Sequence, residues 1–263
     1  MKLKYIDIHS HLQFPQFDSD REEVIARMKK NGVGAIVVGT DFESSKKAVE
    51  LAEQHENLWA SVGMHPNDNT EEIFNFDAYK KLTENSKVVA IGECGLDYFR
   101  NENSEEEKKR QKEIFELHIK LAVRSNLPLM LHVRDAYEDI LEILIQNKKR
   151  YGDKLRGNVH FFAGDLEIAK RLFAMDFSVS FTGVVTFTSD YDEVIKSAPI
   201  DMVMTETDSP YVAPKPYRGK RNEPTYVKEV AHKIAEIRGE NINELQKRFI
   251  DNFKTRFNPK ENI

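Results

Sequence analysis

Two histidines near the start of the chain, His9 and His11, have the type and spacing of metal ligands. They end the apolar run Tyr5–His11, which is typical of a β-strand, and residues two apart in a strand project from the same face. Imidazole nitrogen is a common ligand of zinc, copper, iron and nickel. Because the chain has 8 histidines, one such pair is a weak indication by itself. It gains weight because other ligand types also follow apolar runs: Glu93, His132, His160 and Asp208.

The elements that must position these residues alternate regularly along the chain. Strands are predicted near 5–9, 34–40, 58–64, 88–93, 127–132, 158–162, 177–181 and 202–206. Helices are predicted near 20–30, 44–55, 104–125, 136–149 and 165–176, and two more end the chain near 224–238 and 243–257. Such alternation indicates a parallel sheet with crossover helices. Eight units without a linker or repeat predict an α/β fold of the (β/α)8 TIM-barrel type, with an extra C-terminal helix, in one domain over 1–263.

The candidate ligands lie at the carboxyl ends of strands one, four, five, six and eight, which converge on one face of a barrel. Six nitrogen and oxygen ligands exceed what one tetrahedral ion needs, so we expect two divalent cations, with Glu93 able to bridge them. Nitrogen-rich ligation suits zinc, whereas carboxylates and phosphate chemistry suit magnesium or manganese. Glu206 and Asp208 share one side of an extended strand, so one is expected to bind metal directly and the other to support it.

Composition narrows the classes of protein and of partner. The net charge of −5 does not by itself indicate a nucleic-acid binder. A basic cluster at Lys215, Arg218, Lys220 and Arg221 is either a solvated loop or a phosphate clamp. One cysteine excludes an internal disulfide, and no signal peptide or membrane-length apolar run is evident. We therefore expect a cytoplasmic protein with no membrane partner, and we expect a monomer because no long apolar stripe is left over.

Seven segments together resemble the TatD-type metal-dependent deoxyribonucleases of the metallo-dependent hydrolase superfamily. They are Asp7–His11, Val62–Pro66, Ile91–Tyr98, Leu131–Ala136, Val159–Gly164, Glu206–Tyr211 and Arg218–Pro224. They occur in the family's order over nearly the full length. The resemblance implies a distorted TIM barrel that hydrolyses phosphodiester bonds in DNA, several members acting as 3′→5′ exonucleases. One departure is Phe161, where many members have cysteine; strand alternation predicts that it points away from His160.

The resemblance also implies how the ligands divide between the cations. One would be held by His9, His11, Glu93 and Asp208, and the other by Glu93, His132 and His160. As the catalytic residues, Asp208 would orient or deprotonate the attacking water and Glu93 would bridge. Asp97 would orient a ligand from behind, a usual role for a carboxylate near metal-bound histidine.

Substrate contacts are assigned to residues around this centre. His65, Arg134 and Arg221 are expected to bind phosphate, although His65 precedes Pro66 and also fits a simple turn. Tyr98, Tyr211 and Tyr217 are candidates to stack on a base.

Two other functions remain open at this point. The same fold and ligands suit hydrolysis of a small ester, lactone, amide or phosphodiester, since fold alone does not choose the substrate. A non-catalytic metal-binding scaffold is the other alternative, which the complete set of ligand types disfavours. His55, His118 and His232 lie in helical patterns and are interpreted as structural or surface residues.

Overall fold

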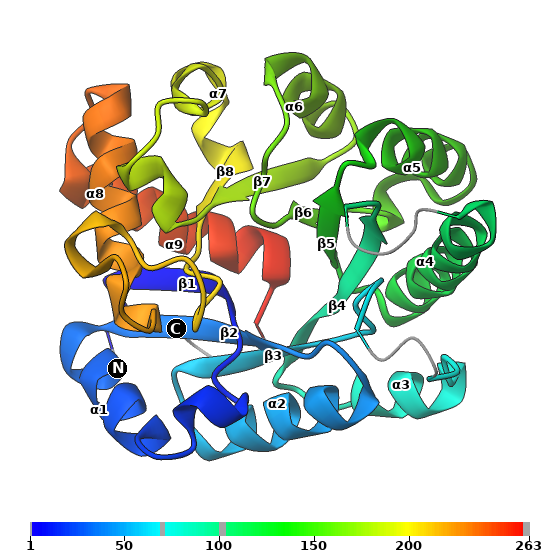
Figure 1. Cartoon of the computed structure of the whole chain (residues 1–263), viewed down its shortest axis with the longest axis horizontal. Helices are drawn as coiled ribbons and strands as arrows, with labels where there is room; N and C mark the ends of the chain where they lie inside the picture. The colour runs from blue at the N-terminus through cyan, green and yellow to red at the C-terminus, as the bar shows by residue number, and fades with distance from the viewer. Residues whose placement is uncertain (1, 69–71, 100–103, 260–263) are drawn as a thin grey trace.

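Eight parallel strands follow one another around a barrel, each paired with the next in chain order (Figure 1). This arrangement is seen in a computed structural model that describes residues 2–68, 72–99 and 104–259. The strands are β1 Tyr5–Ser10, β2 Val33–Val38, β3 Leu58–Val62, β4 Val88–Asp97, β5 Leu129–Arg134, β6 Gly157–Val159, β7 Phe177–Phe181 and β8 Val203–Thr205. The TIM-barrel prediction is confirmed.

The seam between the first and last strands is only partly bonded. β1 and β8 share no continuous ladder, and an isolated parallel bridge joins Ser10 to Ser209 just beyond β8. The Asp208 amide also donates to the His9 carbonyl oxygen at 2.9 Å. The barrel is therefore nearly closed, and the seam lies beside two candidate ligands.

Helices surround the strands on all sides in Figure 1. They are α1 Arg21–Asn31, α2 Phe42–Gln54, α3 Phe76–Leu82, α4 Glu105–Ser125, α5 Tyr137–Tyr151, α6 Leu166–Phe173, α7 Asp192–Ser197, α8 Val227–Arg238 and α9 Ile242–Phe257. The seven predicted helices are present, with ends shifted by a few residues. α3 and α7 were not predicted, because 7 and 6 residues are too few to show a helical apolar period.

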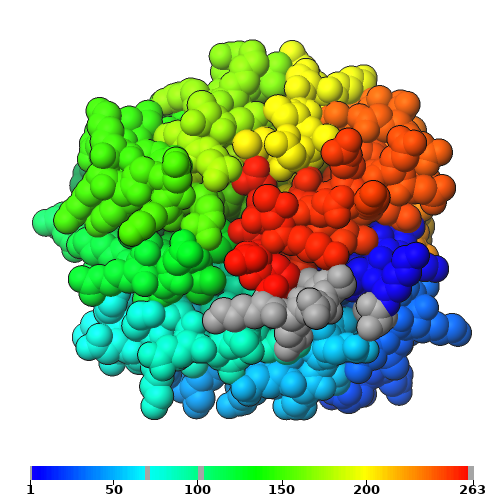
Figure 2. Space-filling model, turned by 180° about the vertical axis from the view of Figure 1, so that it is seen from behind, coloured from blue at the N-terminus to red at the C-terminus, as the bar shows by residue number. Residues whose placement is uncertain are grey.

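The last helix, α9, closes one end of the barrel. Figure 2, which views the molecule from behind, shows it over the centre of that face. Phe253 of α9 packs on Trp59 near the start of β3, with ring centroids 4.8 Å apart. Asn252 donates to the carbonyl oxygen of Val203, the first residue of β8, at 3.1 Å. The amino ends of the strands are thus covered, which leaves their carboxyl ends for a site.

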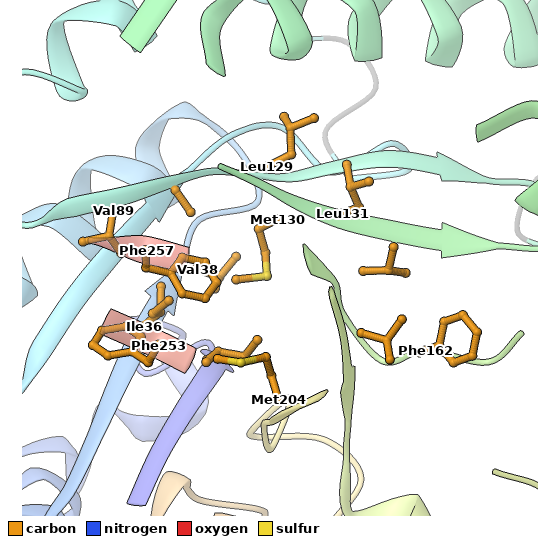
Figure 3. Close-up of a cluster of buried hydrophobic side chains, with 14 of the residues drawn as sticks. Ile36, Val38, Val89, Leu129, Met130, Leu131, Phe162, Met204, Phe253 and Phe257 are labelled. Carbon is orange, nitrogen blue, oxygen red and sulfur yellow. The ribbon is translucent and has the colours of Figure 1, made fainter. Parts of the chain in front are cut away.

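The interior near α9 is apolar. Figure 3 shows Met130 and Met204 reaching from opposite strands into the same space, with Phe253 and Phe257 nearby. All four side chains are buried. Burying this apolar surface is the main stabilising contribution to the fold, and it keeps water away from that end of the barrel. In the part of the chain that the structure describes, no helix is both long and apolar enough to span a bilayer.

Candidate metal centre

A single carboxylate, Glu93 of β4, lies at the centre of the candidate ligands. Its Oε1 atom is 2.9 Å from His132 Nδ1 and 2.9 Å from His160 Nε2. The same oxygen is 3.6 Å from His65 Nε2. His132 belongs to β5, and His160 directly follows β6. One oxygen of Glu93 therefore faces nitrogen donors from two other strands.

The second oxygen of Glu93 faces the two histidines at the end of β1. Oε2 is 3.4 Å from His9 Nε2 and 3.7 Å from His11 Nε2. Asp208 Oδ1 closes this side, at 3.5 Å from His11 Nε2 and 3.9 Å from His9 Nε2. The His9 and His11 nitrogens themselves are 3.3 Å apart, so the predicted same-face geometry is present.

These contacts define two donor groups that share Glu93. In each, one atom from every residue lies within 4.8 Å of the others, His9 and His11 with Glu93, and His132 and His160 with Glu93. Neutral imidazole and carboxylate are suitable donors for divalent cations. The residues present therefore fit a metal, and the division of the ligands between two cations stays a prediction.

In three of these imidazoles, the ring nitrogen that faces away from Glu93 contacts another group. His11 Nδ1 is 2.8 Å from the Val38 carbonyl oxygen. His132 Nε2 is 3.1 Å from Asp97 Oδ2. His160 Nδ1 is 3.3 Å from Glu206 Oε2. Metal-bound histidines usually donate their other N–H to a carboxylate or a carbonyl, which fixes the ring. Asp97 and Glu206 thus contact the rings of His132 and His160, and their supporting role stays a prediction.

Glu206 is itself held rigidly by the neighbouring strands. Its Oε1 accepts from the Ser180 hydroxyl of β7 at 2.7 Å and from the Phe161 amide at 2.6 Å. The alternation argument for Phe161 was wrong, because β6 ends at Val159 and Phe161 has a positive φ of 44°. The turn aims its amide at Glu206, so this residue positions His160 through its backbone.

One buried acid, Asp7 of β1, received no role from the sequence although it begins a matching segment. Its Oδ1 accepts from the Thr207 amide at 2.9 Å and from the His9 amide at 3.2 Å. Burial raises the pKa of Asp7 well above its ordinary value, although the bond from Thr207 opposes that shift. Asp7 therefore ties the His9 backbone to the chain beyond β8. Its position two residues before His9, on the same face of β1, was the available signal.

A glycine allows β4 to approach β5 at the site. Gly92 has a φ of +147°, and a Cβ atom there would lie 2.2 Å from the Met130 carbonyl oxygen of β5. The pairing of β4 with β5 shifts register between Ile91 and Cys94, which brackets Gly92 and Glu93. The residue before the central carboxylate must therefore be glycine.

The predicted phosphate contacts fall in different places. His65 lies within the cluster and also contacts Asp68 Oδ1 at 3.3 Å. Arg134 is exposed, with its guanidinium 3.6 Å above the Phe99 ring. The Arg221 guanidinium instead forms a two-pronged pair with Asp20, at 2.7 and 2.6 Å. His65 thus joins the centre, whereas Arg221 is paired with Asp20, the residue just before α1.

The three tyrosines considered for base stacking also differ. The Tyr98 hydroxyl donates to Asp139 at 2.6 Å, and its ring is largely buried. Tyr217 is stacked on Tyr226 with ring centroids 3.6 Å apart. Tyr211 is 47% exposed and lies 6.5 Å from the His11 ring. Of these three tyrosines, only Tyr211 is both exposed and close to the centre.

The carboxylates of the centre are held in their charged form. Burial alone would raise the pKa of Glu93, but attraction to His160 and His65 keeps it well below its ordinary value. Burial likewise opposes ionisation of Asp208, and the hydrogen bond with His11 lowers its pKa nonetheless. Since metal binding requires deprotonated ligands, both groups are suited to bind cations.

Comparison with known proteins places this centre in a family. The sequence model of the family described as TatD related DNase matches residues 6–258. The chain belongs to the TatD-related DNase family. It is 42% identical over 257 residues to an uncharacterized metal-dependent hydrolase of Bacillus subtilis, covering 95% of this chain and 98% of the relative. It is also 34% identical over 261 residues to a protein of Shigella flexneri named 3'-5' ssDNA/RNA exonuclease TatD, covering 95% and 98%.

Solved structures of TatD proteins share the architecture. A TatD homologue from Escherichia coli superposes with a TM-score of 0.89 at 30% identity, covering 98% of this chain and 99% of that one. A TatD-family hydrolase from Entamoeba histolytica gives a TM-score of 0.85 at 25% identity, covering 98% and 99%. The protein is thus a metal-dependent hydrolase of the TatD family, with histidine and carboxylate clusters able to hold metal.

Proposed function

We propose that this TatD protein hydrolyses phosphodiester bonds in DNA, removing nucleotides from the 3′ end, at a centre of two divalent cations. The observation that carries the proposal is the position of Glu93, whose two oxygens face two separate groups of nitrogen donors. A relative at 34% identity is named a 3'-5' exonuclease, which supports the choice of substrate.

These contacts support two sets of metal ligands. His9, His11, Glu93 and Asp208 would hold one cation, and Glu93, His132 and His160 the other. When bound, two such cations neutralise phosphate oxygens and favour ionisation of water at neutral pH. Zinc, magnesium and manganese are the candidate ions, because the donors combine nitrogen with carboxylate oxygen.

The residues of the chain have distinct tasks in this reaction. The Asp208 carboxylate, whose side chain is 14% exposed, orients the attacking water and accepts its proton. His65 faces the same centre and donates a hydrogen bond to a phosphate oxygen. Arg134 adds positive charge near the end of β5. Asp97 and Glu206 hold the rings of His132 and His160, so that the donor nitrogens do not turn away.

The test uses metal-stripped protein reloaded in turn with magnesium, manganese and zinc. A 5′-labelled single-stranded oligonucleotide should shorten stepwise from its 3′ end, and Glu93→Gln should abolish this shortening. Bound metal is measured in parallel by mass spectrometry. Protein that binds two ions but cleaves no phosphodiester would overturn the proposed substrate and favour a small ester, lactone or amide. Protein that binds no ion would overturn the centre itself.

A further inference from the structure

Exposed aromatic rings gather on the loops that follow the strands. Among the described residues, five large apolar side chains are exposed, and three of these are aromatic: Phe99 at 60%, Phe187 at 41% and Tyr211 at 47%. Phe99 lies two residues beyond β4, Phe187 follows a short 3-10 turn after β7, and Tyr211 lies beyond β8. All three therefore lie at the carboxyl ends of strands, the same end as the metal centre.

Two of these rings each carry an arginine on one face. The Arg134 guanidinium lies 3.6 Å above Phe99, and that of Arg218 lies 3.8 Å from Phe187. Both arginines are exposed, and within the described residues neither forms an ion pair with a carboxylate. Each ring thus offers an open face beside an uncompensated positive charge.

The two pairs lie on different sides of the barrel. The turn that leads to Phe187 packs against α8, whereas β4, which ends two residues before Phe99, packs against α4. α8 and α4 lie on opposite sides of the strands in Figure 1. A ligand that reaches both pairs must therefore extend across the end of the barrel, where Glu93 and its histidines lie.

We propose that Phe99 with Arg134, and Phe187 with Arg218, form two base-stacking subsites for single-stranded nucleic acid. Unpaired bases stack on aromatic rings whatever their identity, and a neighbouring guanidinium attracts the phosphates between them. Bases in a duplex stack on each other and cannot do this. The pairs thus select an unpaired strand without reading its sequence. This inference rests on the proposed function, because it assigns residues of this chain that bind the strand cleaved at the same centre.

The test measures binding and cleavage with Phe99→Leu/Phe187→Leu, which keeps apolar bulk but removes both rings. Fluorescence anisotropy in metal-free buffer with a labelled oligothymidylate should show Kd raised at least about fivefold, the low end of what stacking of one base contributes. Ile145→Leu is the matched control, because Ile145 is 39% exposed on the outer helix α5. Its Kd should equal that of the parent.

An oligonucleotide with abasic sites identifies the interaction. The parent should bind it more weakly than the intact strand, and the double variant should no longer distinguish the two. An equal loss in parent and variant would overturn the proposal. A parent that is dimeric, and that the leucine substitutions make monomeric, would also overturn it, because a second copy would then cover the rings.

Cleavage separates this inference from the proposed function. The ratio of kcat/KM for the oligonucleotide to that for methyl p-nitrophenyl phosphate should fall in the double variant and hold in Ile145→Leu. A parent that hydrolyses both substrates, with a ratio unchanged in the double variant, overturns the subsites alone. A metal-loaded parent that hydrolyses neither substrate overturns the proposed function.

Discussion

At the scale of single residues, the centre depends on one carboxylate that contacts five imidazoles. Glu93 reaches His9 and His11 with one oxygen and His65, His132 and His160 with the other. Because that side chain is nearly fully buried, its charge is compensated by these neighbours rather than by water. Its substitution should therefore affect both donor groups at once.

Replacing Glu93 with glutamine should lower turnover at least about 100-fold, because a neutral amide neither bridges two cations nor offsets their charge. Bound metal should fall below that of the parent in mass spectrometry. The fold should persist, since glutamine has nearly the same shape. Glu43→Gln, on the exposed surface of α2, is the control and should keep full metal content. Unchanged metal content in Glu93→Gln would refute the bridging role.

Replacing Glu206 with glutamine should weaken one metal site selectively. The carboxylate accepts from both the Ser180 hydroxyl and the Phe161 amide while facing His160 Nδ1, and an amide group cannot serve all three as acceptor. We expect roughly a 10- to 100-fold loss of metal affinity at the group containing His160. Titration calorimetry should resolve one weakened and one intact site. Equal weakening of both sites would contradict this assignment.

The types of the candidate ligands and their positions at the ends of strands were predictable from the sequence. The residues that support these ligands were only partly predictable. His9 lies in β1 and His11 follows its last residue, so the spacing of two predicted their common direction. The role of Asp7 depends on a bond to Thr207, 200 positions away, which no local pattern contains. The pairing of Arg221 with Asp20 likewise depends on tertiary contact, so the sequence could not distinguish Arg221 from Arg218 of the same basic cluster, which forms no ion pair within the described residues.

At the scale of elements, β4 is the strand whose geometry depends most on particular residues. It spans 10 residues, and its register against β5 shifts where Glu93 enters the centre. The prediction ended this strand at 93, because the charged and glycine residues beyond it are unfavourable in a buried strand. The polar residues at this end of β4 serve the site, because Glu93 and Asp97 both face histidines.

Replacing Gly92 with alanine should destabilise the protein by more than about 3 kcal/mol, because an added Cβ meets a backbone oxygen and φ is one that L-residues avoid. Gly239→Ala is the control. Gly239 also has a positive φ, of +67°, in the left-handed α region, but a Cβ there meets nothing within 4 Å. Its loss should be about 1 to 2 kcal/mol. Urea denaturation of both variants measures the difference, and equal losses would show that the close approach is unimportant.

At the scale of the whole molecule, stability should depend on pH through a histidine outside the centre. His118 of α4 is fully buried, where its Nε2 accepts from the Met64 amide at 3.0 Å. Burial lowers the pKa of His118 from 6.5 to about 4. Below pH 6.5 the unfolded chain therefore binds a proton that the folded chain does not. The free energy of unfolding should fall as the pH falls from 6.5 towards 4, by up to roughly 3 kcal/mol from this group.

His118→Gln should reduce this dependence without removing it, because other buried groups also titrate. Urea denaturation at several values between pH 4 and 7 gives the slope for each protein. His232→Gln removes an exposed histidine of α8 and serves as the control. If the slope of His118→Gln equals that of the parent, His118 does not contribute.

The eightfold alternation made the barrel predictable, because each strand and its helix are local in sequence. The seam was not predictable, since β1 and β8 meet only through scattered contacts. The position of α9 over the barrel end was also not predictable, because the apolar residues of a helix do not show which surface the helix packs against. The described helices and strands pack against one another from β1 to α9, and the single domain over 1–263 stays a prediction.

The seam also sets an order of events during synthesis of the chain. β1 is made first, yet the residues that bond to its free edge lie near position 209. A ribosome adds about 5 to 20 residues per second, so β1 waits on the order of 10 to 40 s for its last neighbour. Ile6 and Ile8 are fully buried in the folded protein. During that interval their side chains remain partly exposed to water. Nascent chains of this protein should therefore depend on chaperones until β8 emerges.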